Sequence, residues 1–168
     1  MRLGSLEPEQ MDKEVVKRLS QQKKLCPQFH LSLQSGCNAT LRRMNRHYSS
    51  EEYAAIVENL RASFENAAIT TDIMVGFAGE SEKEFEESLA FAQTIGFAKA
   101  HVFAYSRRPG TRADSMPDQL PNAIKEERSR RMIAQTNRTR AAFLKTQVGR
   151  TETVLFESRC ENGVYEGY

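Results

Sequence analysis

The sequence has few cysteines, and none of the spacings that usually bind a metal. Its three cysteines, Cys26, Cys37 and Cys160, are scattered and odd in number, which argues against a disulfide framework. Cys26 and Cys37 lie too far apart for a CxxC or CxxxCxxC motif, and the histidines are not spaced as metal ligands. By itself, the sequence therefore offers no metal site.

Long hydrophobic runs are also missing. No apolar run is long enough to cross a membrane, and residues 1–10 lack the character of a signal peptide. We therefore expect a soluble, cytoplasmic protein with no membrane partner. The 168 residues suffice for one domain with a real core, and the net charge of +2 conceals an acidic segment at 80–87 and basic segments at 42–47 and 125–150.

Common nucleotide and nucleophile motifs are absent as well. The GFAGE segment at 76–80 has neither the lysine nor the spacing of a GxxxxGK[ST] phosphate loop, and it is not GxGxxG. Ser35-Gly36 does not form a GxSxG nucleophile elbow. These absences argue against a phosphate-loop nucleotide site and against an α/β-hydrolase.

One stretch, from Ile69 to Phe85, has a clear local pattern. Its apolar, β-branched beginning is typical of a buried strand, and Gly76 and Gly79 permit a tight turn. Ser81 then caps an acidic segment that favours a helix. Loops of this kind follow the carboxyl ends of strands, where α/β proteins bind ligands.

The same alternation runs through the chain and predicts an α/β fold with a parallel sheet of at least four strands. Asn38, Ser49 and Asn122 are the expected caps of three of the helices, and Gly96 is the expected end of another. A hairpin is predicted near the end, with a strand at 151–157 and a turn at Asn162-Gly163. We expect strands at 2–6, 29–33, 69–75 and 98–105, and helices at 9–24, 38–44, 49–64, 81–96 and 122–147.

Polar residues at four strand ends should meet on one face of such a sheet: Ser5, Gln34-Ser35, Asp72 with 76–80, and 101–106. They are either a binding site or ordinary connecting loops. The basic helix at 122–147 likewise admits two interpretations, a solvated face or a surface for nucleic-acid phosphates.

Five motifs, in this order, carry a family resemblance: RLGSLEP, FHLSLQSGCNATLRRMNRHY, ITTDIMVGFAGESEKEFEE, HVFAYSRRPGTRADSMPDQLP and KEERSRRM. Over residues 1–147 the chain resembles the radical S-adenosylmethionine methylthiotransferases. HLSLQSGC and TLRRMNRHY look most like the branch that acts on threonylcarbamoyladenosine in tRNA. The isopentenyladenosine branch usually has proline in place of Ser32, and the ribosomal-protein branch typically departs from QSG.

The resemblance implies a partial TIM-like barrel. Residues 1–147 would be the C-terminal part of the radical S-adenosylmethionine barrel, and 148–168 the truncated start of a TRAM domain, a small RNA-binding β-barrel. Such a half barrel has open edges, so we expect self-association or domain swapping. Ala78 departs from the family's usual proline, but Gly76 and Gly79 should still form the loop.

The implied enzyme adds a methylthio group to C2 of N6-threonylcarbamoyladenosine next to the tRNA anticodon, using S-adenosylmethionine and two 4Fe-4S clusters. The cluster motif CxxxCxxC is absent from the sequence, so we expect the isolated chain to be inactive, with no catalytic residue or metal ligand of its own. Alternatives are a relative acting on another RNA base or a ribosomal protein, and a non-catalytic RNA-binding fragment.

The resemblance, together with position at the strand ends, implies which residues contact the cofactor. The basic turn at 106–111 and the basic helix at 122–147 supply the candidates for contacts to RNA. The expected cofactor-binding residues are Ser5, Gln34, Ser35, Arg46, Asp72, Ile73, Gly76, Glu80, Val102 and Phe103. The expected RNA-binding residues are Arg107, Arg108, Arg128, Arg131 and Arg138.

Overall fold

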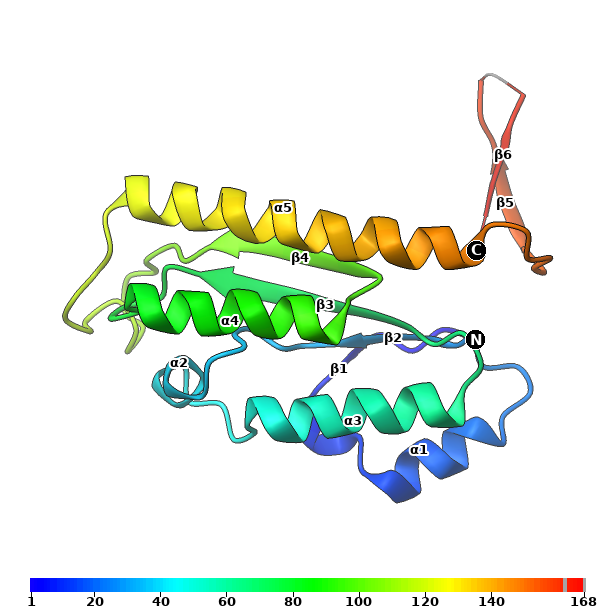
Figure 1. Cartoon of the computed structure of the whole chain (residues 1–168), viewed down its shortest axis with the longest axis horizontal. Coiled ribbons are helices and arrows are strands. Elements are labelled where there is room, and N and C mark those ends of the chain that lie inside the picture. Colours follow the sequence, from blue (N-terminus) through cyan, green and yellow to red (C-terminus); the bar gives the residue numbers. More distant parts are fainter. Residues whose placement is uncertain (162, 168) are drawn as a thin grey trace.

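A single four-stranded parallel sheet organises most of the protein. The computed structural model describes residues 1–161 and 163–167. The sheet order is β1-β2-β3-β4, and every neighbouring pair is parallel, as the sequence predicts (Figure 1). The strands are β1 (Ser5–Leu6), β2 (Gln28–Leu31), β3 (Ala68–Val75) and β4 (Lys99–Ala104). Its edges are β1 and β4, and self-association through them stays a prediction.

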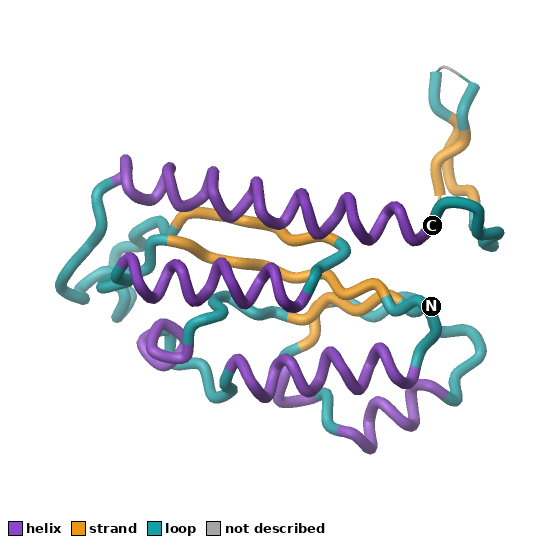
Figure 2. The backbone as a smooth tube through the Cα atoms, viewed as in Figure 1, coloured by secondary structure: helices purple, strands orange, loops and turns teal. Residues whose placement is uncertain are grey.

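The helices form a layer against the sheet (Figures 1 and 2). In this layer α5 runs along β4, α4 lies beside α5, and α1 packs against α3. No helix in the two described ranges is long and apolar enough to span a membrane. The helices are η1 (Pro8–Gln10, a 3-10 helix), α1 (Lys13–Ser20), α2 (Asn38–Arg43), α3 (Ser50–Ser63), α4 (Glu82–Ile95) and α5 (Asn122–Gln147).

The two faces of the sheet differ in burial. Along β3, Ile69, Ile73 and Val75 are buried, while Asp72 and Met74 between them are partly exposed. This alternation places the first set under the helices, because successive strand side chains point to opposite faces. Burying each large side chain under that layer contributes about 1.5–3 kcal/mol. The other face of the sheet, the open face, is partly exposed, and no helix in the described part of the chain covers it.

Three predicted helix starts need correction. The helix expected at 9–24 is two elements, because Asp12 accepts a 2.7 Å hydrogen bond from the Val15 amide and caps α1 there. Asn38 and Asn122 are the first residues of α2 and α5, not their caps. The side-chain oxygen Oδ1 of Asn38 instead accepts hydrogen bonds from the backbone N–H and the hydroxyl of Ser50.

The end of the chain forms a hairpin that projects beyond the last turn of α5 (Figure 1). It consists of β5 (Phe156–Arg159) and β6 (Tyr165–Gly167), which pair antiparallel. The predicted strand at 151–157 is therefore placed too early, since pairing with β6 begins only at Phe156. In the predicted turn, Gly163 has a φ of 80°, whereas Asn162 lies outside the described residues.

Two helices begin with the reciprocal hydrogen bonds of a capping box, α3 at Ser49 and α4 at Ser81. Ser49 and Ser81 were both predicted as helix caps, and both are confirmed. In the second capping box, Glu84 accepts from the Ser81 N–H. It also accepts two hydrogen bonds of 2.8 Å from the two terminal nitrogens of the Arg43 guanidinium. These hydrogen bonds hold the pKa of Glu84 at about 2 and fasten α2 to the start of α4.

Replacing Gly96 by alanine isolates the effect of backbone conformation. Gly96 ends α4 with a φ of 66°, and no atom lies within 4 Å of the position of an added Cβ. We expect Gly96→Ala to lower the free energy of unfolding by about 1 kcal/mol in urea denaturation, because only the left-handed conformation opposes the side chain. Gly4→Ala is the matched control, since its added Cβ is equally free and its φ is not positive. Equal losses in both variants would contradict this explanation.

The Arg43–Glu84 pair should make stability depend on pH. The folded pKa of about 2 lies below the ordinary value of 4.5, so the stabilisation is present above about pH 5 and is lost as the pH falls toward 2. Because Arg43 is partly exposed, we expect Glu84→Gln to cost only about 1 kcal/mol at pH 7 and almost nothing near pH 2.5. Urea titrations at both pH values measure this difference. Glu58→Gln, on an exposed position of α3, is the control, and a pH-independent loss in Glu84→Gln would exclude the ion pair as its cause.

Candidate functional site

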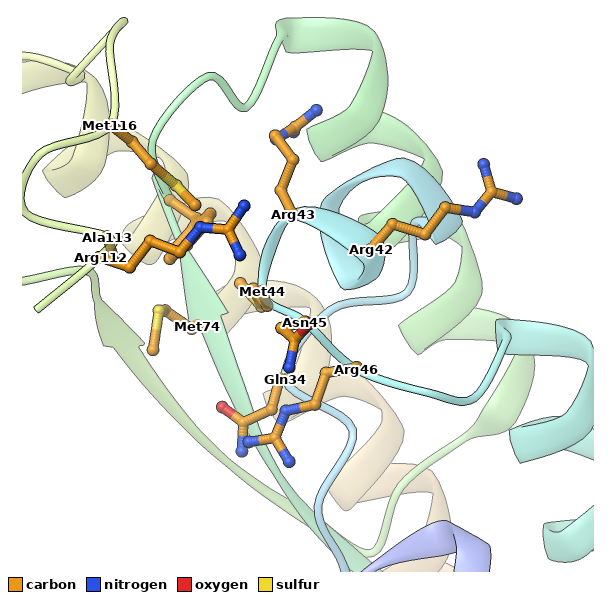
Figure 3. A pocket seen from close by; sticks show the side chains of 11 residues that line it. Gln34, Arg42, Arg43, Met44, Asn45, Arg46, Met74, Arg112, Ala113 and Met116 are labelled. Atoms are coloured by element: carbon orange, nitrogen blue, oxygen red, sulfur yellow. The ribbon is translucent and has the colours of Figure 1, made fainter.

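A pocket of about 550 Å³ lies where β2 and β3 end (Figure 3). This volume is in the range of small-molecule sites, which α/β proteins place at the carboxyl ends of their strands. Four segments far apart in sequence supply its walls: the end of β2, α2 with the following turn, β3 with its glycine loop, and the loop after β4. The lining residues are Gln34, Arg42, Arg43, Met44, Asn45, Arg46, Met74, Phe77, Arg112, Ala113 and Met116.

Arginines and methionines dominate this lining. Arg46 donates to Glu7 at 2.9 Å and, with Gln34, lines one end of the pocket as seen in Figure 3. Arg112 reaches toward the pocket from the loop after β4, and Met44 and Met74 lie between these polar ends (Figure 3). The pocket can thus offer cationic and amide groups to an anionic or hydroxylated ligand and thioether walls to an apolar one.

Two residues of the pocket have left-handed backbones. Gln34 has a φ of 65° and Asn45 a φ of 60°. Two backbone hydrogen bonds to β3 fix Gln34. Its backbone N–H donates to the Asp72 carbonyl at 2.9 Å, and its backbone carbonyl accepts from the Met74 N–H at 2.8 Å. Such a conformation costs a non-glycine residue about 1–2 kcal/mol, and strain of this kind gathers at binding sites.

The glycine loop after β3 is held from within by Glu80. The Glu80 carboxylate accepts hydrogen bonds from the Gly76 amide at 2.7 Å and from Arg128 at 2.8 Å, and the residue is only 3% exposed. Burial raises the pKa of this carboxyl, while those hydrogen bonds act in the opposite direction. Gly76 has a φ of 71°, and an added Cβ would come within 2.6 Å of Lys125 Cγ, so this position requires glycine. Glu80 therefore shapes the pocket wall and does not line it.

A second pocket, of about 410 Å³, adjoins the first. Both are lined by Met74, Phe77 and Ala113, and the second adds Phe103 and Tyr105 among others. The ring of Phe77 meets that of Tyr105 edge-on at a centroid distance of 5.0 Å. Phe77 is thus a shared wall, and the two pockets together form a long site with one charged and one aromatic part.

The structure brings three of the predicted cofactor residues to these pockets, and Gly76 immediately precedes their shared wall. Gln34 and Arg46 line the first pocket and Phe103 lines the second, where it is 40% exposed. Gln34 and Phe103 were expected from their positions at strand ends, and Arg46 from the family resemblance.

Other predicted cofactor residues have their side chains elsewhere. Ile73 and its register partner Val102 point to the helix-covered face, so only their backbone can meet a ligand on the open face. Ser35 is fully buried, and its hydroxyl accepts from the Cys37 amide. Asp72 lies on the open face, 3.4 Å from the His30 ring, and is farther back along β3 than Met74.

On the same face, Ser5 is the register partner of His30 and is exposed.

The predicted RNA contacts need one correction. Arg128 is buried against Glu80 and Glu82, so it is unavailable to a phosphate. Arg131 is partly exposed and bound to Glu82 and Glu86. Arg107 donates to Asp114 at 2.7 Å, whereas Arg108 and Arg138 are exposed.

Several pocket residues were not predicted from the sequence. Met74 had a usable signal, because period-two alternation puts it opposite Ile73 and Val75. Arg112 and Met116 had none, because they reach the pocket only when their loop docks on the glycine loop. One hydrogen bond of that docking runs from the Gly79 amide to the Asp118 carbonyl at 2.9 Å.

The cysteines do not fit an iron–sulfur cluster. Cys26 is exposed, and the buried thiol of Cys37 donates to Glu87 at 3.1 Å. Burial, with a smaller contribution from Glu87, raises the pKa of the Cys37 thiol, which disfavours the thiolate that a cluster needs. Within residues 1–161 and 163–167, no group of three or more potential ligands could hold a metal ion.

Comparison with known proteins agrees with this geometry. A protein from Mycobacteroides abscessus named tRNA-2-methylthio-N(6)-dimethylallyladenosine synthase is 40% identical over 155 residues, covering 92% of this chain and 31% of that protein. A protein of the same name from Treponema pallidum is 37% identical over 166 residues, covering 99% and 36%. The chain thus spans about a third of the length of these relatives. Both names specify a dimethylallyl group, not the threonylcarbamoyl group expected from the motifs.

The fold has a solved counterpart in the coproporphyrinogen III oxidase HemN from Escherichia coli, a radical SAM enzyme. The TM-score is 0.61 at 17% identity, over 84% of this chain and 31% of that one, which supports the fold alone. The family described as the Radical SAM superfamily matches residues 4–92, which include β1 to β3, the glycine loop and most of α4. The chain belongs to the radical SAM superfamily, and its relatives at 37–40% identity support membership of the methylthiotransferase family within it.

Proposed function

We propose that this chain forms one side of the S-adenosylmethionine site of a tRNA methylthiotransferase. The observation that carries the proposal is the pocket at the ends of β2 and β3, most of whose walls lie within the matched residues 4–92. In this proposal, residues 1–147 are the C-terminal part of the radical SAM domain and 148–168 begin a TRAM domain. The open face of the sheet then lines the inside of a larger barrel, in the cytoplasm.

The lining supports binding of this cofactor in chemical terms. S-adenosylmethionine, when bound to an iron–sulfur cluster, supplies the 5′-deoxyadenosyl radical. Arg46 and Gln34 suit its carboxylate and hydroxyl groups, since guanidinium and amide groups both donate to oxygen. Met74, Phe77 and Phe103 offer an apolar wall that suits adenine. The cluster ligands are not among this chain's described residues, so these side chains would bind and orient the cofactor only.

We infer that the substrate is an adenosine next to the tRNA anticodon that carries an N6 substituent and receives a methylthio group at C2. The motifs HLSLQSGC and TLRRMNRHY favour a threonylcarbamoyl substituent, whereas the relatives' names favour dimethylallyl. Arg107, Arg108, Arg131 and Arg138 stay the proposed contacts to RNA phosphates.

A titration with S-adenosylmethionine tests the pocket directly. The chain has six methionines, of which Met44, Met74 and Met116 line the pocket, while Met11 and Met132 are buried in the core. With ¹³C-methyl-labelled methionine, we expect NMR shifts in the first three signals and none in the last two. No shift, or shifts confined to the core methionines, would contradict the proposed site.

Gln34→Gly separates binding from folding. Glycine relieves the left-handed strain at a φ of 65° and removes the side-chain amide, so the unfolding free energy should stay equal or rise. We expect about tenfold weaker binding of S-adenosylmethionine, equivalent to about 1.4 kcal/mol. The control is Gln93→Ala, in the α4 helix and outside this pocket. Unchanged affinity in Gln34→Gly would exclude the amide as a ligand contact.

Nucleoside mass spectrometry of tRNA identifies the substrate. We expect a strain lacking the gene to lose one 2-methylthio nucleoside and to accumulate its precursor, either N6-threonylcarbamoyladenosine or N6-dimethylallyladenosine. Restoring the gene should reverse both changes. Unchanged tRNA nucleosides would contradict the proposal and direct attention to a ribosomal protein.

A further inference from the structure

The first turns of α5 hold the loop that walls the pocket. Two cationic residues there, Lys125 and Arg128, are 6% and 4% exposed and lie three positions apart, on the same side of the helix. Neither residue lines the two adjoining pockets. Both nevertheless bind the segments that do, through two separate sets of contacts.

Arg128 fixes the end of the glycine loop. Its Nη1 donates to the Glu80 carbonyl at 2.8 Å and to the Glu80 carboxylate at 2.8 Å. The same carboxylate oxygen accepts from the Gly76 amide at 2.7 Å. One guanidinium therefore determines where the loop ends, and through Glu80 where it begins. Phe77 lies between these two points.

Lys125 fixes the other side of the same wall. Its ammonium donates to the Tyr105 carbonyl at 3.1 Å, just after β4, and lies 5.3 Å from the centre of the Tyr105 ring. The Tyr105 ring packs edge-on against Phe77. The Lys125 side chain also passes so close to Gly76 that an added Cβ would meet it at 2.6 Å. Phe77 is thus held between a loop fixed by Arg128 and a ring fixed by Lys125.

The chemistry of these contacts argues for a role beyond stability. Burying a cationic side chain is unfavourable unless it is well paired, and apolar residues of similar volume often stabilise a core as well or better. Among the described residues, the Lys125 ammonium donates one hydrogen bond, to the Tyr105 carbonyl. The two cations can do one thing that apolar residues cannot: each donates a directional hydrogen bond that holds one backbone carbonyl at the pocket in place.

We propose that Lys125 and Arg128 are positioning residues, which set the place of Phe77 and thereby the affinity of the pocket for S-adenosylmethionine without touching the ligand. The identity of the ligand rests on the proposed function, whereas the effect on the pocket wall does not. The two parts of the claim can therefore be tested separately in one set of spectra.

The test compares Lys125→Leu and Arg128→Lys with the control Lys145→Leu, at an exposed position of the same helix. Methionine-methyl NMR spectra are recorded without ligand and during titration with S-adenosylmethionine, and urea denaturation gives the stability. We expect Lys125→Leu to move the Met74 and Met116 signals before any ligand is added, to leave Met11 in place, and to weaken binding at least tenfold. Arg128→Lys keeps the charge but loses the planar guanidinium that donates to two oxygens at once, so a smaller change in the same signals is expected. The control should match the wild type.

Pocket signals and affinity that stay unchanged while stability falls would overturn the proposal, since the two residues would then be structural only. If wild-type protein fails to bind S-adenosylmethionine, the proposed function is wrong, and the ligand-free spectra alone decide the positioning role. If Lys125→Leu does not fold, Arg128→Lys decides by the same signals.

Discussion

The buried ion pair between Glu80 and Arg128 is the interaction on which the pocket depends. Its two side chains are 1% and 5% exposed, and together they join the glycine loop to α5. Removing one partner of such a pair typically costs about 3–5 kcal/mol, because the other charge is left buried, whereas an exposed pair contributes about 1 kcal/mol or less. The loop geometry therefore depends far more on Glu80 and Arg128 than on the surface charges.

The α5 helix carries this constraint along the molecule. Its 26 residues correspond to about 39 Å, from the pocket loops to the base of the hairpin. At its far end the amides of Gln147 and Asn66 exchange two hydrogen bonds, of 2.6 and 2.8 Å. Both ends of the helix are thus fixed to the loops around the sheet, one beside the pocket and one at the opposite side. In the proposed organisation, the RNA-binding TRAM part begins right after α5, the helix whose first turns shape the pocket.

Local chemistry explains why much of this fold is predictable from the sequence. Ser81 and Gly96 mark the two ends of α4, since each satisfies backbone groups that any helix leaves unpaired. The period-two burial of β3 likewise follows from its residues. The pocket is less predictable, because the left-handed backbone of Gln34 and the pairing of Arg128 with Glu80 require contacts between distant segments. Composition even misled, since the charge of Arg128 resembles that of an RNA-binding residue until its buried partner is known.

Hydrogen exchange with and without S-adenosylmethionine tests the central claim, that the pocket at the strand ends binds this cofactor. The account predicts slower exchange in the two segments that contribute most of its wall, 34–46 and 74–80, with little change at the opposite side around Asn66 and Gly96. Those two residues line a separate pocket and serve as an internal control. Protection that is absent from 34–46 and 74–80, or that is found only at the opposite side, would contradict the account.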